Sequence, residues 1–217
     1  PLHGHGPRKE LLMLRQVLRK PLTKLGLVLV CLMPFAWLCS GIFLDGLGPN
    51  PAEYLIRSTG NWTLRFLCIT LLVTPLRVVF NMPELLRFRR NLGVLTFFYA
   101  LMHALCYSVF DMGLAWDEIV ADIVKRPFIA VGFAGAVMLS LLAATSFNAA
   151  IKMLGAVRWR MLHRLVYAIA VLAILHFFWM RSGKQDFTEV FVYAGILGVL
   201  LGWRVWHAAN SRLQARL

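Results

Sequence analysis

Long apolar runs without charged residues restrict this chain more than any other feature of its sequence. The most informative run covers residues 159–180, where sixteen uncharged residues separate Arg164 from Arg181. In lipid, such a segment must satisfy its own backbone hydrogen bonds, which favours a helix. The run contains His163 near its start and His176 near its end. A polar ring in hydrocarbon is costly without a binding partner, so we interpret both histidines as candidate functional residues.

Composition indicates a membrane protein. Hydrophobic residues make up 59% of the chain and charged residues 15%, with a mean hydropathy of +0.69, whereas soluble domains are about a quarter charged. The four cysteines lie in apolar runs without CxxC spacing, so we interpret them as packing residues. The first run, 25–44, has twenty uncharged residues, which predicts a span and not a signal-peptide core. The expected fold class is therefore an all-α integral membrane protein.

Hydropathy predicts a bundle of six transmembrane helices. The expected spans cover 22–44, 60–79, 92–110, 127–150, 159–180 and 188–206. They divide the chain into a basic amphipathic segment (1–21), a six-span domain (22–207) and a short basic tail (208–217). The second span is the weakest, because Arg65 and Arg77 leave only eleven uncharged residues between them.

The connections carry further expectations. Before the second span, prolines and Gly60 indicate turns, with a short interfacial helix over 51–57. The connection over 111–127 is acidic and amphipathic. In the fourth span, Gly132 and Gly135 suit close contact between helices.

The distribution of charge predicts the orientation. Six spans place both termini on one side, and that side holds seventeen of the 23 Lys and Arg residues. The opposite side holds six Lys and Arg and eight of the ten acidic residues. The positive-inside rule therefore predicts cytoplasmic termini. The net charge of +13 is explained by topology and by attraction of the 1–21 segment to anionic lipid, which makes nucleic-acid binding a poor alternative.

Three histidines form the candidate site. His103 lies about 17 Å along its span, and His176 lies about 20 Å beyond His163, so His103 and His176 reach a comparable depth. Two imidazoles at one level can take both axial positions of a b-type haem. His163 would then serve a second site nearer the cytoplasm. The alternative is that these histidines only pack or form hydrogen bonds.

One geometric point opposes the simplest form of this hypothesis. Thirteen residues at about 100° each place His163 and His176 roughly 220° apart on an ideal helix. Either the helix is distorted, or the two rings face different neighbours. Arg65, expected one to two turns inside the outer surface, pairs with a haem propionate or reaches the headgroups.

The motifs that carry a resemblance occur in order over most of the chain. They are TG at 59–60, the basic residue at 65, TPL at 74–76, RRxLG at 89–93, the histidine and tyrosine at 103 and 107, RP at 126–127, TS at 145–146, WxxLHxxVY at 159–167, the histidine at 176, and YAG at 193–195. Each is weak alone, whereas the ordered set is specific. The chain resembles the haem-binding membrane subunits of bacterial periplasmic methionine sulfoxide reductase systems, the MsrQ (YedZ) family within the ferric-reductase-like transmembrane group.

The resemblance implies a six-helix bundle in the bacterial inner membrane that binds haem b, with FMN or a quinone as further candidate ligands. It implies that His103, His163 and His176 are the haem-ligating residues. It also implies that electrons come from a cytoplasmic flavin reductase or the quinone pool. They would pass to a periplasmic molybdenum-containing catalytic subunit that repairs oxidised methionine.

Two other classes of protein remain as alternatives. A self-contained ferric reductase or cytochrome b-like oxidoreductase usually carries a nicotinamide- and flavin-binding domain after its spans, and here about ten residues follow Trp206. A non-redox transporter or scaffold would more often show interrupted spans and carboxylates near the membrane midplane, and no expected span centre contains Asp or Glu. The cofactor would carry the chemistry, because no residue resembles a catalytic acid, base or nucleophile.

Overall fold

The structure is a computed structural model that describes residues 6–214, apart from the side chains of residues 6–9, 11, 184, 212 and 213. Residues 1–5 and 215–217, at the outer ends of the two predicted basic terminal segments, lie outside the described residues. From residue 6 to residue 214 the chain forms nine α-helices and no strand. The helices are α1 (Gly6–Arg19), α2 (Pro21–Phe43), α3 (Pro51–Val79), α4 (Leu86–Cys106), α5 (Trp116–Lys125), α6 (Pro127–Ala144), α7 (Asn148–Leu162), α8 (Leu165–Arg181) and α9 (Thr188–Gln214).

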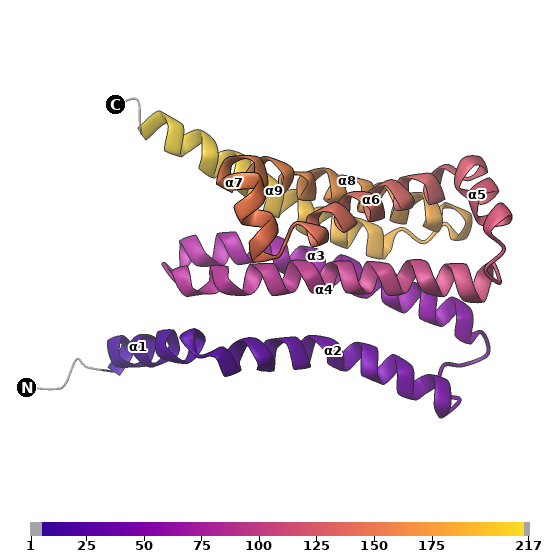
Figure 1. Cartoon of the computed structure of the whole chain (residues 1–217), viewed down its shortest axis with the longest axis horizontal. Helices are drawn as coiled ribbons and strands as arrows, with labels where there is room; N and C mark the ends of the chain where they lie inside the picture. Colours follow the sequence, from indigo (N-terminus) through magenta and orange to yellow (C-terminus); the bar gives the residue numbers. More distant parts are fainter. Residues whose placement is uncertain (1–5, 215–217) are drawn as a thin grey trace, which may run out of the picture.

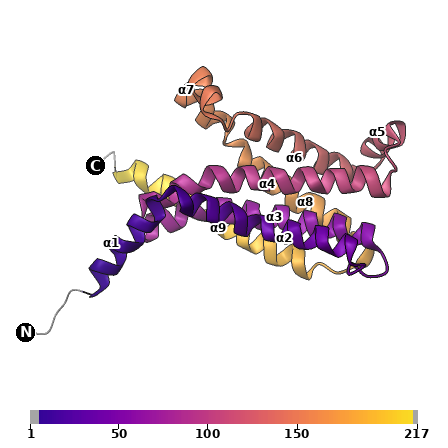
Figure 2. The same ribbon diagram turned by 60° about the horizontal axis from the view of Figure 1, so that its bottom comes forward.

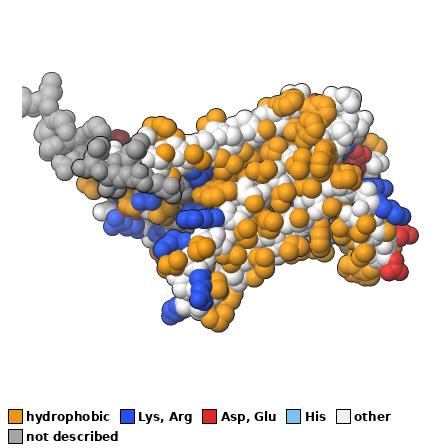
Figure 3. All heavy atoms as spheres, turned by 90° about the horizontal axis from the view of Figure 1, so that it is seen from above, with side chains coloured by type: hydrophobic (Ala, Val, Ile, Leu, Met, Phe, Trp, Pro, Cys, Tyr) orange, Lys and Arg blue, Asp and Glu red, His pale blue; other side chains and the backbone are white. Residues whose placement is uncertain are grey.

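The long helices run side by side as a bundle (Figure 1). Among the described residues, five segments are long and apolar enough to cross a membrane, and α7 with α8, a pair bent by 46°, provides up to one more. α1 and the C-terminal end of α9 lie at the same end of the bundle (Figure 1). On the face shown in Figure 3, hydrophobic side chains cover the middle, whereas Lys and Arg gather toward one end. The predicted all-α, multi-pass fold is confirmed.

Two helix pairs make up most of the bundle. α3 packs most extensively against α4, and α6 packs against α8, while α9 contacts both α3 and α8. Buried side chains of α3, α6, α8 and α9 form the main core, in which Leu71 is fully buried. Large apolar side chains along the spans, such as Leu29, Val171 and Val199, are exposed, as a lipid-facing surface requires.

Tyr99 of α4 supports α2 beside an internal proline. Its fully buried hydroxyl donates to the carbonyl of Cys31, at 2.8 Å, and accepts from the N–H of Phe35, at 3.1 Å. An α-helix would join these two backbone groups directly. Because Pro34 opens the helix at this point, the hydroxyl bridges them instead. The bridge keeps α2 continuous across the proline.

Arg204 of α9 plays a similar part in α3. Pro75 has no N–H, so the carbonyl of Leu71 lacks its usual helical donor. The Arg204 guanidinium donates to this carbonyl and also lies 5.9 Å from the ring centre of Tyr167. In membrane helices, side chains of neighbouring helices commonly satisfy the groups that a proline frees. The contact joins α3, α8 and α9 around one partly buried cation.

The second span differs from the prediction. α3 begins at Pro51 and continues for 29 residues, so the expected turn at Gly60 and the separate short helix are wrong. The side chain of Asn50 accepts from the N–H of Glu53 and Pro51 occupies the first turn, a strong helix start. Gly60 stays helical and packs against another helix. Arg65 therefore lies at the middle of α3, about 21 Å from its start.

The fifth span is also different, because it breaks at His163. α7 ends at Leu162 and α8 begins at Leu165, and α7 itself is kinked at Gly155, where φ is 74°. The rotation expected for an ideal helix between His163 and His176 therefore does not apply.

The fourth span ends earlier than predicted. α6 stops at Ala144, where the hydroxyls of Thr145 and Ser146 turn back to carbonyls of the last turn. Such local hydrogen bonds compete with continuation of a helix. The indole N–H of Trp159 then donates to the Thr145 carbonyl at 2.9 Å, which ties α7 to the end of α6.

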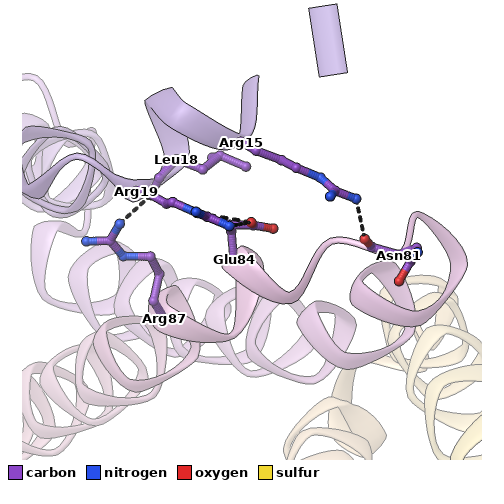
Figure 4. Close-up of polar contacts among 6 residues, drawn as sticks. All are labelled: Arg15, Leu18, Arg19, Asn81, Glu84 and Arg87. Atoms are coloured by element: carbon purple, nitrogen blue, oxygen red, sulfur yellow. Dashed lines mark hydrogen bonds and ion pairs between the residues drawn. The ribbon is translucent and has the colours of Figure 1, made fainter. Parts of the chain in front are cut away.

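α1 diverges from the rest of the bundle (Figure 2). Figure 4 shows the polar contacts that join it to the turn between α3 and α4. These contacts are Arg15 to the Asn81 carbonyl (2.9 Å), Arg19 to the Glu84 carboxylate (2.7 Å) and Arg87 to the Leu18 carbonyl (2.7 Å). The apolar side chains of Leu12, Met13 and Val17 remain exposed.

Candidate functional site

α4 brings His103 against α3. The Nδ1 atom of His103 lies 2.8 Å from the carbonyl oxygen of Ile56. Because a carbonyl can only accept, Nδ1 carries the proton and donates, and Nε2 keeps its lone pair. Gly60, one turn after Ile56, leaves room for the imidazole ring beside α3. The ring is therefore fixed in one tautomer and against one helix.

α8 brings His176 against α6 in the same manner. Its Nδ1 donates to the carbonyl oxygen of Phe128 at 2.7 Å. Gly132, four residues after this acceptor, again borders the ring. One arrangement thus occurs twice, in the α3–α4 pair and in the α6–α8 pair: a histidine donor, a helix carbonyl, and a glycine four residues after that carbonyl.

The two rings lie next to each other between the helix pairs. Their centroids are 6.1 Å apart, and their planes are inclined at 79°. Over the described part of the chain, Nδ1 makes the only hydrogen bond of each ring. Both Nε2 atoms are therefore available to a ligand. The structure brings together the two histidines that the sequence placed at comparable depth.

A metal held by these two rings alone would lack ligands. Within residues 6–214, no group of three or more His, Cys, Asp or Glu side chains is arranged to hold a metal ion. Haem brings its iron with four ligands and needs only axial side chains. Two imidazoles bound to one metal at about 2 Å each have ring centroids about 6 Å apart, close to the observed separation. The residues therefore fit a haem with two axial histidines.

His163 lies away from this pair, beyond the start of α8 at Leu165, which is eleven residues or about 17 Å of helix before His176. It caps α7 at the bend, where its ring stacks on Trp159 with centroids 3.9 Å apart. Its Nδ1 atom lies 3.0 Å from the Trp159 carbonyl, whereas Nε2 is buried without a partner among the described residues. A buried, unpartnered ring nitrogen is costly, so this atom is a candidate ligand.

Arg65 lies at the middle of α3, and only one of its guanidinium nitrogens makes a hydrogen bond within the described chain. Its Nε donates to the hydroxyl of Tyr193 at 3.2 Å, and its guanidinium lies 4.6 Å from the ring centre of Trp62. No carboxylate pairs with it among the residues that the structure describes. It also lines a cavity of about 630 Å³ between α2 and α3, together with Ser58 and Asn61. The guanidinium can therefore donate further hydrogen bonds to an acidic group.

Sequence reasoning missed the groups that orient the two histidines. The acceptors are backbone carbonyls of Ile56 and Phe128, and no residue type marks a carbonyl that accepts a second hydrogen bond. Gly60 was expected to lie in a turn, whereas Gly132 was expected at a close helix contact, which the structure shows to be with His176. A glycine in an apolar run was the one signal available for Gly132, whereas the polar neighbours of Gly60 pointed to a turn.

The comparisons with known proteins agree on one family. Residues 59–174 match the family described as ferric reductase like transmembrane component. No solved structure matches the chain. The matched range contains Gly60, His103, Phe128 and Gly132. Ile56 and His176 lie just outside it.

Three relatives share the same description, protein-methionine-sulfoxide reductase heme-binding subunit MsrQ. The protein of Polaromonas naphthalenivorans is 60% identical over 193 residues, which covers 88% of each chain. The protein of Ralstonia nicotianae is 51% identical over 84% of each chain. The protein of Herminiimonas arsenicoxydans is 47% identical over 88% of each chain.

Proposed function

The chain belongs to the MsrQ family of ferric-reductase-like membrane proteins, and we propose that it carries electrons across the membrane through b-type haem. Its relatives are described as heme-binding subunits of a protein-methionine-sulfoxide reductase. Within that function we propose that His103 and His176 would together hold one haem. The protein itself is a redox subunit, and a separate catalytic subunit acts on the substrate.

One observation carries this assignment. The imidazoles of His103 and His176 come from different helices, lie 6.1 Å apart and keep both Nε2 atoms free of hydrogen bonds within the described chain. Histidines that served only in packing would have no reason to lie side by side with both Nε2 atoms free of hydrogen bonds. When bound, haem supplies an iron that accepts and releases one electron at a time.

The protein supplies the orientation and surroundings of the ligands. The Ile56 and Phe128 carbonyls fix each ring through Nδ1, and this hydrogen bond makes the opposite nitrogen a stronger ligand. The ring of Phe128 lies beside His176, with the ring centroids 6.2 Å apart, and gives the pair an apolar neighbour. A low local dielectric and fixed ligands are the means by which a protein sets the potential of an iron centre.

The proposal extends to a second haem site at His163. The buried Nε2 of this residue has no described partner, which supports a role as a ligand. Arg65 is assigned to the first haem, where its free donors would bind a propionate through parallel hydrogen bonds. Both roles agree with the implied haem-ligating set of three histidines.

We assign the end that carries α1 to the cytoplasm and place the protein in the bacterial inner membrane. The sequence assigns seventeen of the 23 Lys and Arg residues to the side of the two termini, which supports this orientation. His163 then lies toward the cytoplasm, and the His103–His176 pair lies toward the periplasm. Electrons would enter near His163 and leave near the pair.

The proposed donor is a cytoplasmic flavin reductase, with the quinone pool as the other source. Arginines of the cytoplasmic end would bind an FMN phosphate or an acidic donor protein; they are Arg87, Arg89, Arg90, Arg158 and Arg160. The proposed acceptor is the periplasmic molybdenum-containing subunit. Each methionine sulfoxide that it reduces takes two electrons and two protons and yields methionine and water, so two single-electron transfers are needed per turnover.

The terminal segments would attach to lipid. Residues 1–21 form the basic segment that we propose lies on anionic lipid headgroups, and 208–217 form the short cytoplasmic tail, on either side of the haem-binding domain, 22–207. The exposed Leu12, Met13 and Val17 of α1 support this, because an amphipathic helix at a membrane surface turns its apolar face to the acyl chains.

The direct test measures haem in the purified protein and its variants. Protein from haem-replete cells should show a Soret band that shifts and sharpens on reduction. H103A and H176A should each abolish the same low-spin haem. H207A is the matched control, because His207 is exposed and stacks only on Trp203. Reduction by FMN with a flavin reductase, compared with a quinol, identifies the donor.

A colourless wild-type protein would refute the proposal. Unchanged spectra of H103A and H176A would refute the assignment of these two ligands.

A further inference from the structure

We propose that Gly60 and Gly132 are positioning residues that set the hydrogen bond of each axial histidine and thereby the reduction potential of the haem. The inference rests on the proposed function, because it takes His103 and His176 as the ligands of one iron. It adds a role for two residues that carry no functional group.

The space beside each histidine exists only because the neighbouring residue is glycine. A Cβ added to Gly132 would lie 2.7 Å from Nδ1 and 2.9 Å from Cε1 of His176. A Cβ added to Gly60 would lie 3.1 Å from both Nδ1 and Cε1 of His103. The first separation forces the ring to move, and the second requires a shift of a few tenths of an ångström.

The position of each glycine explains how the hydrogen bond is possible. In an α-helix the Cα–Cβ bond tilts toward the N-terminus, so a side chain covers the surface of the preceding turn. A side chain at 60 would therefore cover the carbonyl of Ile56, and one at 132 would cover that of Phe128. Glycine leaves each carbonyl open to a second donor, which is Nδ1 of the facing histidine.

Two other glycines show that this role is specific. Gly135 lies one turn after Gly132 on α6, and its added Cβ would meet the Leu172 side chain at 3.9 Å. Gly93 of α4 faces α3, where the added Cβ would meet the Thr70 side chain at 4.0 Å. These are ordinary van der Waals contacts. The same two helix pairs thus offer a matched control for each positioning glycine.

The chemical consequence has a definite sign. Donation from Nδ1 to a carbonyl places more electron density on the imidazole and raises its basicity toward the metal. A more basic ligand stabilises ferric iron over ferrous iron and lowers the reduction potential. Displacing the ring from its carbonyl weakens this bond, so the potential should rise.

The experiment compares G132A and G60A with G135A and G93A in the full-length protein. The midpoint potential of the haem that is lost in H103A and H176A is measured by redox titration, and the low-spin ferric signal by electron paramagnetic resonance. We expect G132A to shift the reduction equilibrium up to about tenfold toward ferrous iron, which is about 59 mV for one electron. G60A should shift it less, and the two controls should match wild type.

The outcomes separate this inference from the proposed function. If H103A and H176A lose the haem but G132A and G60A match their controls in potential and spectrum, the inference is wrong and the function stands. If H103A and H176A keep the haem, the proposed ligands are wrong. Should G132A fail to fold, G60A carries the test, because its smaller displacement leaves the helix pair intact. An equal shift in all four variants would also overturn the inference.

Discussion

The bundle contains two histidine sites of different construction. At the first, His103 and His176 reach each other from two helix pairs, and each ring is held by a carbonyl beside a glycine. At the second, His163 lies at the bend between α7 and α8, stacked on a tryptophan of its own segment. The first site has two rings with free Nε2 atoms, and the second has one buried Nε2 without a described partner.

The difference concerns how much of each site the protein arranges before a ligand binds. Two rings at a fixed separation of 6.1 Å form a pair that is ready for one metal. The ring of His163 is fixed by contacts within one turn, so its geometry depends on the bend and on Trp159. We therefore expect the paired site to tolerate changes at the bend, and the bend site to respond to them strongly.

The largest expected effect is the loss of one haem and not the other. H163A should remove the second haem and leave the low-spin signal of the paired site, so that the haem-to-protein ratio falls by about half. The reason is that the two sites share no ligand and that most of α8, about 17 Å from Leu165 to His176, lies between them. Haem content and the reduced-minus-oxidised spectrum measure this. Loss of all haem in H163A would show that the sites are not separate.

Changes at Trp159 should sharpen the contrast further. W159F keeps a ring beneath His163 but loses the indole hydrogen bond to the Thr145 carbonyl, at a cost of about 1 kcal/mol. W159A also loses the stacking, worth about 0.5–1.5 kcal/mol more. Binding of haem at the bend should weaken in that order, as measured by haem titration of apoprotein. An effect of either variant on the paired site would contradict the comparison.

Arg65 should affect only the paired site. R65Q removes this cation, and its loss stabilises ferric iron relative to ferrous iron. The reduction potential of that haem should therefore fall. The change should be on the order of 1 kcal/mol, below the ~4 kcal/mol of unit charges about 4 Å apart at an effective dielectric constant of about 20, because a propionate would separate the guanidinium from the iron. R65K keeps the charge and should show a smaller fall. Redox titration measures the potential of each haem. A shift confined to the haem at His163 would contradict the assignment of Arg65 to the paired site.

The smallest effect is expected at α1. E84Q removes the carboxylate that Arg19 binds at 2.7 Å, and Arg19 is largely exposed. The Glu84 side chain is buried, so its replacement should loosen α1, but neither residue contacts a histidine site and both haems should keep their spectra. The change should appear as faster tryptic cleavage within α1. A loss of haem in E84Q would show that α1 supports a site to which it makes no described contact.

The fold class could be predicted from the sequence, and so could the comparable depth of His103 and His176 along their helices. Both follow from apolar length, charge distribution and the rise of a helix. The break at His163 was not predictable, because residues 159–167 contain no proline or glycine that would mark the end of a helix. The continuity of α3 through Gly60 was also missed, since a glycine beside polar residues indicates a turn unless its packing partner is known.

The partners of the histidines lay beyond sequence reasoning for a physical reason. Every residue has a carbonyl, and only the approach of another helix decides which carbonyl accepts a second hydrogen bond. The same holds for Arg204, whose guanidinium reaches the Leu71 carbonyl that Pro75 leaves without a donor. Such contacts depend on tertiary packing and not on local pattern.

The most direct measurement of the central assignment is low-temperature electron paramagnetic resonance of the oxidised protein, with H103A and H176A alongside. Two imidazoles inclined at 79° nearly equalise the energies of the iron d orbitals that they contact, which gives a strongly anisotropic low-spin signal with a large maximum g value. We expect this signal in wild type and H163A, and its absence in both H103A and H176A. A rhombic signal of parallel rings, or a strongly anisotropic signal that survives in either variant, would contradict the assignment of these two histidines to one iron.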